Sequence, residues 1–211
     1  MTPQRVRRIF ELLQAANPHP QGELEYGNLY ELLVAVILSA QATDKSVNAA
    51  TRGLFKIAST PDAMLQLGLA GLKHHIRTIG LYNAKARNIL ATSRILIEQH
   101  GGKVPHDRAA LEALPGVGRK TANVVLNIGF GEPTLAVDTH VFRVANRTGL
   151  APGRTPLAVE HALMAAIPPR FLNHAHHWLI LLGRYTCKAR RPECQRCPIV
   201  RQCEYPQKTA A

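Results

Sequence analysis

The chain has four cysteines, all within its last 25 residues: Cys187, Cys194, Cys197 and Cys203. Their spacing is C-x6-C-x2-C-x5-C. The first residues, MTPQRVRRIFELL, lack the apolar stretch and cleavage site of a secretory signal, so we expect a non-exported protein with few disulfides. We therefore expect the thiolates to bind metal. Zinc ribbons usually have two CxxC pairs and this chain has one, whereas an iron–sulfur cluster accepts uneven spacing because its metal corners are separated. Both kinds of site remain open at this point.

A second motif is the segment Leu114–Ala122, LPGVGRKTA, between two predicted helices. Gly116 and Gly118 can adopt positive φ, which would let a phosphate approach the backbone, and Val117 between them would anchor the turn in the core. The next helix would offer free N–H groups and the positive end of its dipole. A P-loop would need glycine directly before the lysine, where Arg119 stands. The pattern is that of a helix-hairpin-helix, which grips a DNA backbone without reading sequence; a tight helical hairpin with purely geometric glycines is the alternative.

Lys120 and Asp138 are the residues best suited to chemistry. Lys120 falls in the first turn of a predicted helix, where a cation is disfavoured. That position suggests either a phosphate contact or a neutral amine that acts as a nucleophile. Asp138 is expected to cap the next helix. Its carboxylate could also stabilise a sugar cation or accept a proton. The residues alone make this pair a weak signal.

The net charge narrows the class of partner. Lys and Arg number 26 against 14 Asp and Glu, giving +12, and the pI is about 10.1. Such a balance favours a polyanion, although a solvated basic surface is the alternative. Aromatic residues make up only 5% of the chain, which disfavours base-stacking on single strands and leaves duplex DNA or RNA. No apolar run approaches the ~20 residues of a membrane span, so we expect no membrane partner.

The positions of these motifs follow from a predominantly helical pattern. Apolar residues recur with a period of 3.6, and the one strand-like alternation, Thr134–Val141, is too isolated to predict a strand. Asp44 is expected to cap a helix that runs to Ala58, and Thr60 to cap the one after it. We predict an all-α fold of about ten helices joined by short loops. The expected helices cover residues 5–16, 29–40, 44–58, a segment opening at 61, 69–78, 83–100, 107–113, 119–130, 138–148, 156–167 and 171–185.

Taken together, these segments resemble the endonuclease III family, the bifunctional DNA glycosylase/AP lyases of base excision repair. The resemblance covers nearly the whole chain. Its most specific segments are Leu38–Asp44 (LSAQATD), Ile79–Asn83 (IGLYN), Leu114–Asn123, Val137–His140 (VDTH) and the cysteine spacing.

The resemblance implies two helical domains. One would span residues 22–131 and contain the helix-hairpin-helix at about 107–130. The other would combine residues 1–21 and 132–211 and hold a [4Fe-4S] cluster on the four cysteines. The implied partner is double-stranded DNA that contains an oxidised pyrimidine or an abasic site. We expect a monomer, the default for enzymes that scan DNA, and the lack of an N-terminal extension leads us to expect a bacterial cytoplasmic protein.

The resemblance also implies roles for single residues. Lys120 would attack C1′ of the damaged nucleotide, form an imine and cleave the strand by β-elimination, while Asp138 would promote loss of the base. Gln41 and Leu81 would fill the gap left by the flipped base. The remaining expected DNA contacts lie in the hairpin, after Asp138 and in the cysteine loop: Gly116, Val117, Gly118, Arg119, His140, Lys188, Arg190 and Arg191.

Two other functions compete with this interpretation. A monofunctional mismatch adenine glycosylase would share the hairpin and the cysteine spacing, but it would have no lysine at position 120 and would carry a further C-terminal domain. A non-catalytic helix-hairpin-helix protein would keep the hairpin and the basic charge but would have no need of Lys120 together with Asp138.

Overall fold

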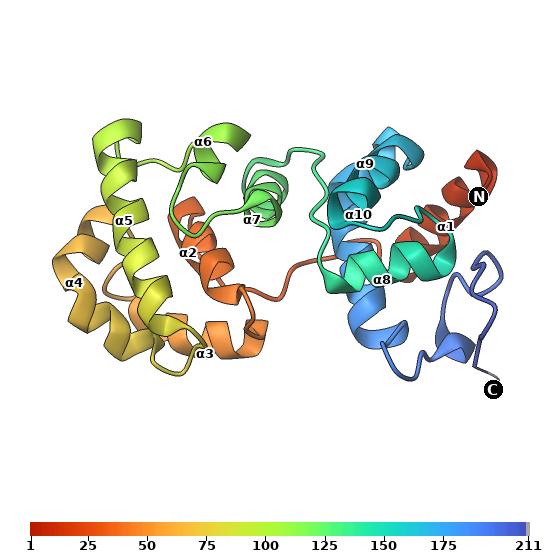
Figure 1. Cartoon of the computed structure of the whole chain (residues 1–211), viewed down its shortest axis with the longest axis horizontal. Coiled ribbons are helices and arrows are strands. Elements are labelled where there is room, and N and C mark those ends of the chain that lie inside the picture. Colours follow the sequence, from red (N-terminus) through yellow and green to blue (C-terminus); the bar gives the residue numbers. More distant parts are fainter. Residues whose placement is uncertain (210–211) are drawn as a thin grey trace. The chain divides into compact units, whose positions relative to one another are not determined.

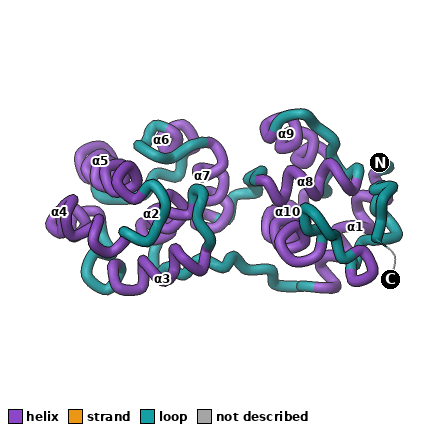
Figure 2. Tube along the Cα trace, turned by 60° about the horizontal axis from the view of Figure 1, so that its bottom comes forward, coloured by secondary structure: helices purple, strands orange, loops and turns teal. Residues whose placement is uncertain are grey.

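The computed structural model describes residues 1–209 and contains helices and loops, with no strand among those residues (Figures 1 and 2). The predicted all-α class is confirmed. The chain folds into two compact units, and its path crosses between them twice. One unit spans Glu23–Gly131, and the other joins Met1–Gly22 to the rest of the chain from Glu132. Within the described residues, no helix is both long enough and apolar enough to cross a membrane.

The unit of residues 23–131 is built around one buried helix, α2. Residues 30–38 of α2 are all buried, as its apolar sequence predicts. Figure 1 shows α2 with α3, α5 and α7 around it, and α2 contacts each of these helices. The elements are α2 (Leu29–Ser39), α3 (Asp44–Leu54), α4 (Pro61–Ile76), α5 (Tyr82–His100), α6 (Arg108–Glu112), α7 (Arg119–Val124) and the π-helical turn η1 (Val125–Gly129).

One predicted helix in this unit has both boundaries wrong. The helix expected to run from an Asp44 cap to Ala58 is capped by Thr43, whose hydroxyl accepts from the Ser46 N–H at 3.2 Å, and it ends at Leu54. Asp44 instead lies in the first turn, where its charge favours the helix dipole. The Thr60 cap is confirmed. The expected break between a helix opening at 61 and a separate helix beginning at 69 is confirmed: Gly68 has a non-helical backbone with a φ of 69°, and the second stretch of α4 ends at Ile76 rather than 78.

The second unit packs its first helix, α1 (Pro3–Ala16), on α10 (Pro169–Leu181). The ring of Phe10 lies 5.7 Å from that of Phe171 and 6.2 Å from that of Trp178. The Trp178 indole N–H donates to the carbonyl of Asn17 at 2.8 Å, which fixes the end of α1. The unit also contains α8 (Thr139–Thr148), α9 (Pro156–Ala166), the π-helical turn η2 (Leu182–Thr186) and a short 3-10 turn, η3 (Cys194–Arg196).

The connection that enters α8 is irregular from residue 132 to 138. The prediction that Thr134–Val141 does not form a strand is confirmed. The apolar pattern there has another cause: Leu135, Ala136 and Val137 are buried in the core, and His176 of α10 hydrogen-bonds the Ala136 carbonyl at 3.0 Å.

Candidate functional site

The predicted hairpin is present between α6 and α7, and its turn is anchored in the core. Val117 is 5% exposed, and its N–H donates to the carbonyl of Leu114 at 3.0 Å. The hydroxyl of Thr92, on α5, donates to the Pro115 carbonyl at 3.0 Å. Val117 therefore holds the turn against the unit, as the sequence predicts.

The two glycines of the hairpin differ in conformation. Gly116 has a φ of 81°, in the region that favours glycine. Gly118 has a φ of −100° and a ψ of 177°, so the expectation that it adopts positive φ is wrong. It is the N-cap of α7, and N-cap residues have extended backbone dihedrals. A Cβ on Gly118 would meet no heavy atom within 4 Å, so the space over the start of α7 is open.

Lys120 is the second residue of α7, which confirms its place in the first turn. Its side chain is exposed, as is that of Arg119. The helix continues through η1 to Gly129, and residues 122–127 are buried. The exposed cations are thus carried at the open end of a helix that is fixed in the core.

Asp138 is the N-cap of α8, as predicted. Its Oδ1 accepts from the N–H groups of His140 and Val141, both at 2.8 Å. The side chain is half-buried. Both of these bonds go to the same carboxylate oxygen, so capping uses one oxygen and leaves Oδ2 for another group. Asp138 and Lys120 belong to different units of the chain.

Gln41 and Leu81 share an unusual backbone. Among residues 1–209 they are the two non-glycine residues with positive φ, at 56° and 61°. Left-handed conformations cost roughly 1–2 kcal/mol for a residue with a Cβ, and such strain concentrates at functional sites. Leu81 is 64% exposed although its side chain is apolar, and Gln41 is exposed as well.

A buried lysine that was not predicted from the sequence is hydrogen-bonded to the segment before Gln41. Lys85, on α5, is 5% exposed, and its Nζ donates to the carbonyls of Leu38 at 2.8 Å and Ala40 at 2.6 Å. Burial lowers the pKa of this amine. A signal was available: Lys85 shares a helix face with the buried Ile89 and Leu96, where a lysine is out of place.

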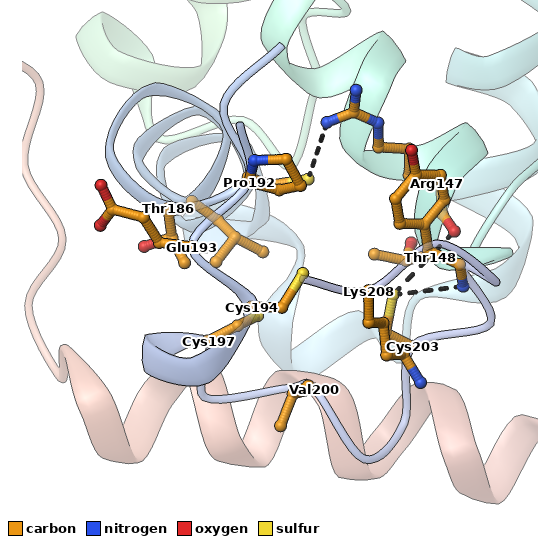
Figure 3. Close-up of a pocket in the computed structure, with 13 residues that line it drawn as sticks. Arg147, Thr148, Thr186, Pro192, Glu193, Cys194, Cys197, Val200, Cys203 and Lys208 are labelled. Atoms are coloured by element: carbon orange, nitrogen blue, oxygen red, sulfur yellow. Dashed lines mark hydrogen bonds between the residues drawn. The ribbon is translucent and has the colours of Figure 1, made fainter. Parts of the chain in front are cut away.

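The four cysteines line one cavity, and all four thiols are free and partly buried. Figure 3 shows Cys194, Cys197 and Cys203 around this space, with Arg147 and Lys208 beside it. Burial raises the pKa of the Cys197 thiol to about 11, and the other three cysteines raise it further. Burial also raises the pKa of Cys203.

Hydrogen-bond donors point at two of these sulfurs. The backbone N–H of Tyr205 lies 3.5 Å from Sγ of Cys203, and Nη1 of Arg147 lies 3.8 Å from Sγ of Cys187. Within residues 1–209, no three His, Cys, Asp or Glu side chains are grouped closely enough to hold a single metal ion.

Two arginines of α8, neither of them predicted from the sequence, hold the loop that follows Cys187. Arg143 donates from Nε to the Cys187 carbonyl at 2.9 Å and from Nη2 to the Gly183 carbonyl at 2.7 Å. Arg147 donates to the carbonyls of Lys188 at 2.6 Å and Ala189 at 2.5 Å. They lie four residues apart, on one helix face. That spacing is visible in the sequence, but their partners are not.

The cations of the cysteine loop fall into two groups. Lys188 and Arg196 both pair with Glu193, and the hydrogen bond from Lys188 is the main cause of the lowered pKa of that carboxyl. Arg190 and Arg191 are exposed. His140, the other predicted contact in this unit, has its Nδ1 3.2 Å from Nη2 of Arg143.

The chain is similar to known DNA repair proteins over most of its length. Residues 34–169 match the model of the HhH-GPD superfamily base excision DNA repair protein. The chain is 61% identical over 200 residues to endonuclease III of Escherichia coli (strain K12), which covers 95% of each chain. It is 62% identical over 192 residues to endonuclease III of Treponema pallidum, with 91% of each covered.

The fold is also similar to those of solved DNA repair proteins. A trapped endonuclease III–DNA covalent intermediate superposes with a TM-score of 0.90 at 45% identity, covering 97% of this chain and 96% of that one. A non-covalent endonuclease III–DNA complex superposes with a TM-score of 0.91 at the same identity and coverage. A thermostable thymine-DNA glycosylase, at 23% identity and a TM-score of 0.85, shares the fold.

Proposed function

Because this chain belongs to the endonuclease III family, within the HhH-GPD superfamily of base excision DNA repair proteins, we propose that it removes oxidised pyrimidines from duplex DNA and then cleaves the strand by β-elimination. It is a DNA glycosylase and an AP lyase, and its partner is DNA. Since that substrate is chromosomal and the relatives are bacterial, we place it with the nucleoid in the cytoplasm, as a monomer.

The observation that carries this proposal is the position of Lys120, an exposed primary amine two residues after the open N-cap of α7. Attack requires the neutral amine, which loss of water against bound DNA favours. Nζ forms a bond to C1′ as the bond to the base breaks, and the base leaves with that electron pair and takes a proton. The amine loses its protons as the sugar ring opens to an imine. Loss of a C2′ proton then expels the 3′ phosphate, and water later hydrolyses the imine and frees Lys120.

Asp138 serves the first of these steps. Its capping bonds through Oδ1 hold the carboxylate in a fixed orientation at the start of α8. We assign it to stabilise the positive charge that develops at C1′ as the base leaves, or to accept a proton from the attacking amine. A monofunctional adenine glycosylase would use a carboxylate of this kind with water as nucleophile, and it would not need Lys120.

The remaining expected contacts hold and open the duplex. Gln41 and Leu81, exposed on strained backbone, are suited to fill the space of a base rotated out of the stack. The open hairpin backbone and nearby cations would bind phosphates. These contacts are Gly116, Val117, Gly118, Arg119, His140, Arg190 and Arg191, with Lys188 limited by its pairing to Glu193.

The cysteine cavity fits a [4Fe-4S] cluster better than a zinc ion. Four thiols line one cavity, two of their sulfurs already face N–H donors, and their spacing has one CxxC pair where a zinc ribbon usually has two. When bound, the cluster would join Cys187, Cys194, Cys197 and Cys203 and supply no step of the reaction on DNA. Its contribution would be to fix the loop that carries Arg190 and Arg191.

The direct test is reductive trapping. The protein is mixed with a duplex that carries one thymine glycol, borohydride is added, and a covalent protein–DNA band is sought. We expect a band with the wild type and with Lys103→Gln, an exposed lysine of the same unit, and none with Lys120→Gln. Base release without a band would favour a monofunctional glycosylase, tested next on an adenine mismatch. Neither band nor base release would leave a DNA-binding protein without this activity.

The metal is tested separately. Iron and acid-labile sulfide are measured in anaerobically purified protein, and both are expected in equal amounts and lost in Cys203→Ser. Zinc without sulfide would contradict the cluster.

A further inference from the structure

Lys85 makes hydrogen bonds to two segments that are distant in the sequence. Its side chain donates to the carbonyls of Leu38 and Ala40, at the end of α2 and immediately before Gln41. Its own backbone N–H donates to the carbonyl of Leu81 at 3.1 Å. One residue thus joins the backbone next to Gln41 to that of Leu81. All of these atoms belong to the unit of residues 23–131.

Capping of α2 alone does not require this arrangement. Helices α5 and α8 both end on a glycine in the left-handed region, Gly101 and Gly149, which closes a helix without a buried charge. At the end of α2 the left-handed residue is Gln41, which has a side chain, and the free carbonyls are taken by an ammonium group removed from water. Burying a charged amine is unfavourable unless its hydrogen bonds are satisfied. Here two carbonyls satisfy it.

Both left-handed residues are linked to Lys85, Gln41 through the lysine side chain and Leu81 through the lysine backbone. Gln41 follows directly on the carbonyl that Lys85 binds at 2.6 Å, and Leu81 lies one helical turn before Lys85 on α5. If the lysine were replaced by an apolar side chain, two carbonyls would lose their donor, and the connection after α2 would be free to leave the left-handed conformation. The direction of Gln41 relative to Leu81 therefore depends on Lys85.

We propose that Lys85 is a positioning residue that fixes the separation of Gln41 and Leu81, so that both side chains enter the duplex together at the damaged position. This inference rests on the proposed function, in which these two residues open the duplex. Lys85 itself touches neither DNA nor the reacting atoms. Its substitution should therefore impair the opening of a duplex and leave intact the steps that need no opening.

The experiment compares Lys85→Met and Lys85→Arg with the wild type, with Lys56→Met, an exposed lysine in the same unit, as the control for loss of charge. The first readout is the emission of 2-aminopurine placed opposite a stable abasic analogue, at saturating protein, since this base fluoresces when it is unstacked. The second is single-turnover base release from a thymine glycol duplex. The third is cleavage of an abasic site in a single strand, which needs no wedge.

For Lys85→Met we expect a lower emission plateau and base release slower by about 10²-fold, the size typical of a displacement of about 1 Å at a reacting centre. Affinity for undamaged duplex and single-strand cleavage should match the wild type. Lys85→Arg, which keeps the donors on a wider head group, should give an intermediate plateau, and Lys56→Met a normal one.

A folded Lys85→Met with the wild-type plateau would overturn the inference, as would an equal loss of single-strand and duplex cleavage. If circular dichroism shows that Lys85→Met is unfolded, Lys85→Arg decides: a lowered plateau supports the role, and a wild-type plateau overturns it. Failure of the proposed function would look different, because the wild type itself would then release no base.

Discussion

The side chain of Asn88 occupies the space that a Cβ on Gly116 would need. Its Nδ2 lies 2.9 Å and its Cβ 3.2 Å from that position, and Gly116 has a φ of 81°. Gly118, two residues later, has an extended backbone and open space around it. The two glycines of the hairpin therefore differ: the backbone of Gly116 requires glycine, whereas Gly118 leaves the start of α7 open.

Exchanging each glycine for alanine should affect stability at Gly116 and DNA binding at Gly118. Gly116→Ala combines a left-handed conformation with a steric conflict, so we expect a loss of about 1–2 kcal/mol of stability and a lower Tm. Gly118→Ala should lower Tm less than Gly116→Ala does, through a poorer N-cap, and should weaken binding to every duplex, because its methyl group would stand where we expect a phosphate to approach. Thermal unfolding and a DNA titration of both variants decide this. Normal DNA binding by Gly118→Ala would mean that no phosphate approaches there.

Asp138→Asn should separate capping from catalysis. Asparagine caps helices as well as aspartate does, so Tm should change little. Base release should slow by about 10²–10⁴-fold, the usual contribution of a positioned acid or base. Asp138→Ala adds the loss of the cap, about 1 kcal/mol. Single-turnover base release and Tm are measured on both, and Asp138→Asn with wild-type rates would show that the carboxylate only caps α8.

Replacing Arg190 and Arg191 by glutamine should weaken binding to damaged and undamaged duplexes alike. Losing two phosphate contacts lowers the slope of log K against log salt by about two units. The control removes Arg8 and Arg170, whose guanidinium groups both pair with Glu11, for the same change in net charge. An equal fall in slope for the two double variants would indicate long-range charge rather than contact.

Arg147→Met should loosen the cysteine loop. The guanidinium donates to two loop carbonyls, faces Sγ of Cys187 and lies 5.1 Å from the ring centre of Tyr205. We expect a chelator to remove iron several-fold faster from this variant than from the wild type. Arg154→Met, an exposed arginine before α9, is the control. Equal rates of iron loss would show that the other loop contacts suffice.

Stability should fall in weak acid because of His177. Burial lowers the pKa of this histidine, and nearby His174 lowers it further. The pKa of this histidine is 6.5 in the unfolded chain and lower in the folded chain. Below pH 6.5 the unfolded chain therefore binds a proton that the folded chain does not yet bind, and stability falls as the pH drops from 6.5 toward the folded pKa. Tm is measured at several pH values from about one unit above to about one and a half units below the unfolded pKa. His177→Gln should show a weaker dependence than the wild type, and exposed His19→Gln the same dependence.

Much of the fold could be predicted because its helices carry local signals. The apolar run of α2 marks a buried helix, and Thr60 and Asp138 mark starts that the structure confirms. Boundaries failed where neighbouring residues compete for one role, as Thr43 and Asp44 do at the start of α3. The break at Gly68, by contrast, was expected, because glycine adopts the left-handed conformation that interrupts the helix there.

The site was predictable where chemistry and spacing coincide in a short segment. The place of Lys120 and the capping by Asp138 follow from a few neighbouring residues. The bonds of Lys85 to residues 38 and 40, and of Arg147 to residues 188 and 189, join segments more than 40 positions apart. A single sequence contains no information on such pairs. The same holds for Lys188, whose pairing with Glu193 depends on how the loop closes.

The packing of α1 on α10 has a consequence for synthesis on the ribosome. Asn17 and the indole of Trp178 that fixes it are 161 residues apart. At about 5–20 residues per second, α1 waits roughly 10–30 s for its partner. The unit of residues 23–131 is complete well before that, so it can fold while α1 still has nothing to pack on. The apolar face of α1, with Val6, Ile9, Phe10 and Leu13, is therefore the segment of the nascent chain that a chaperone would have to cover longest.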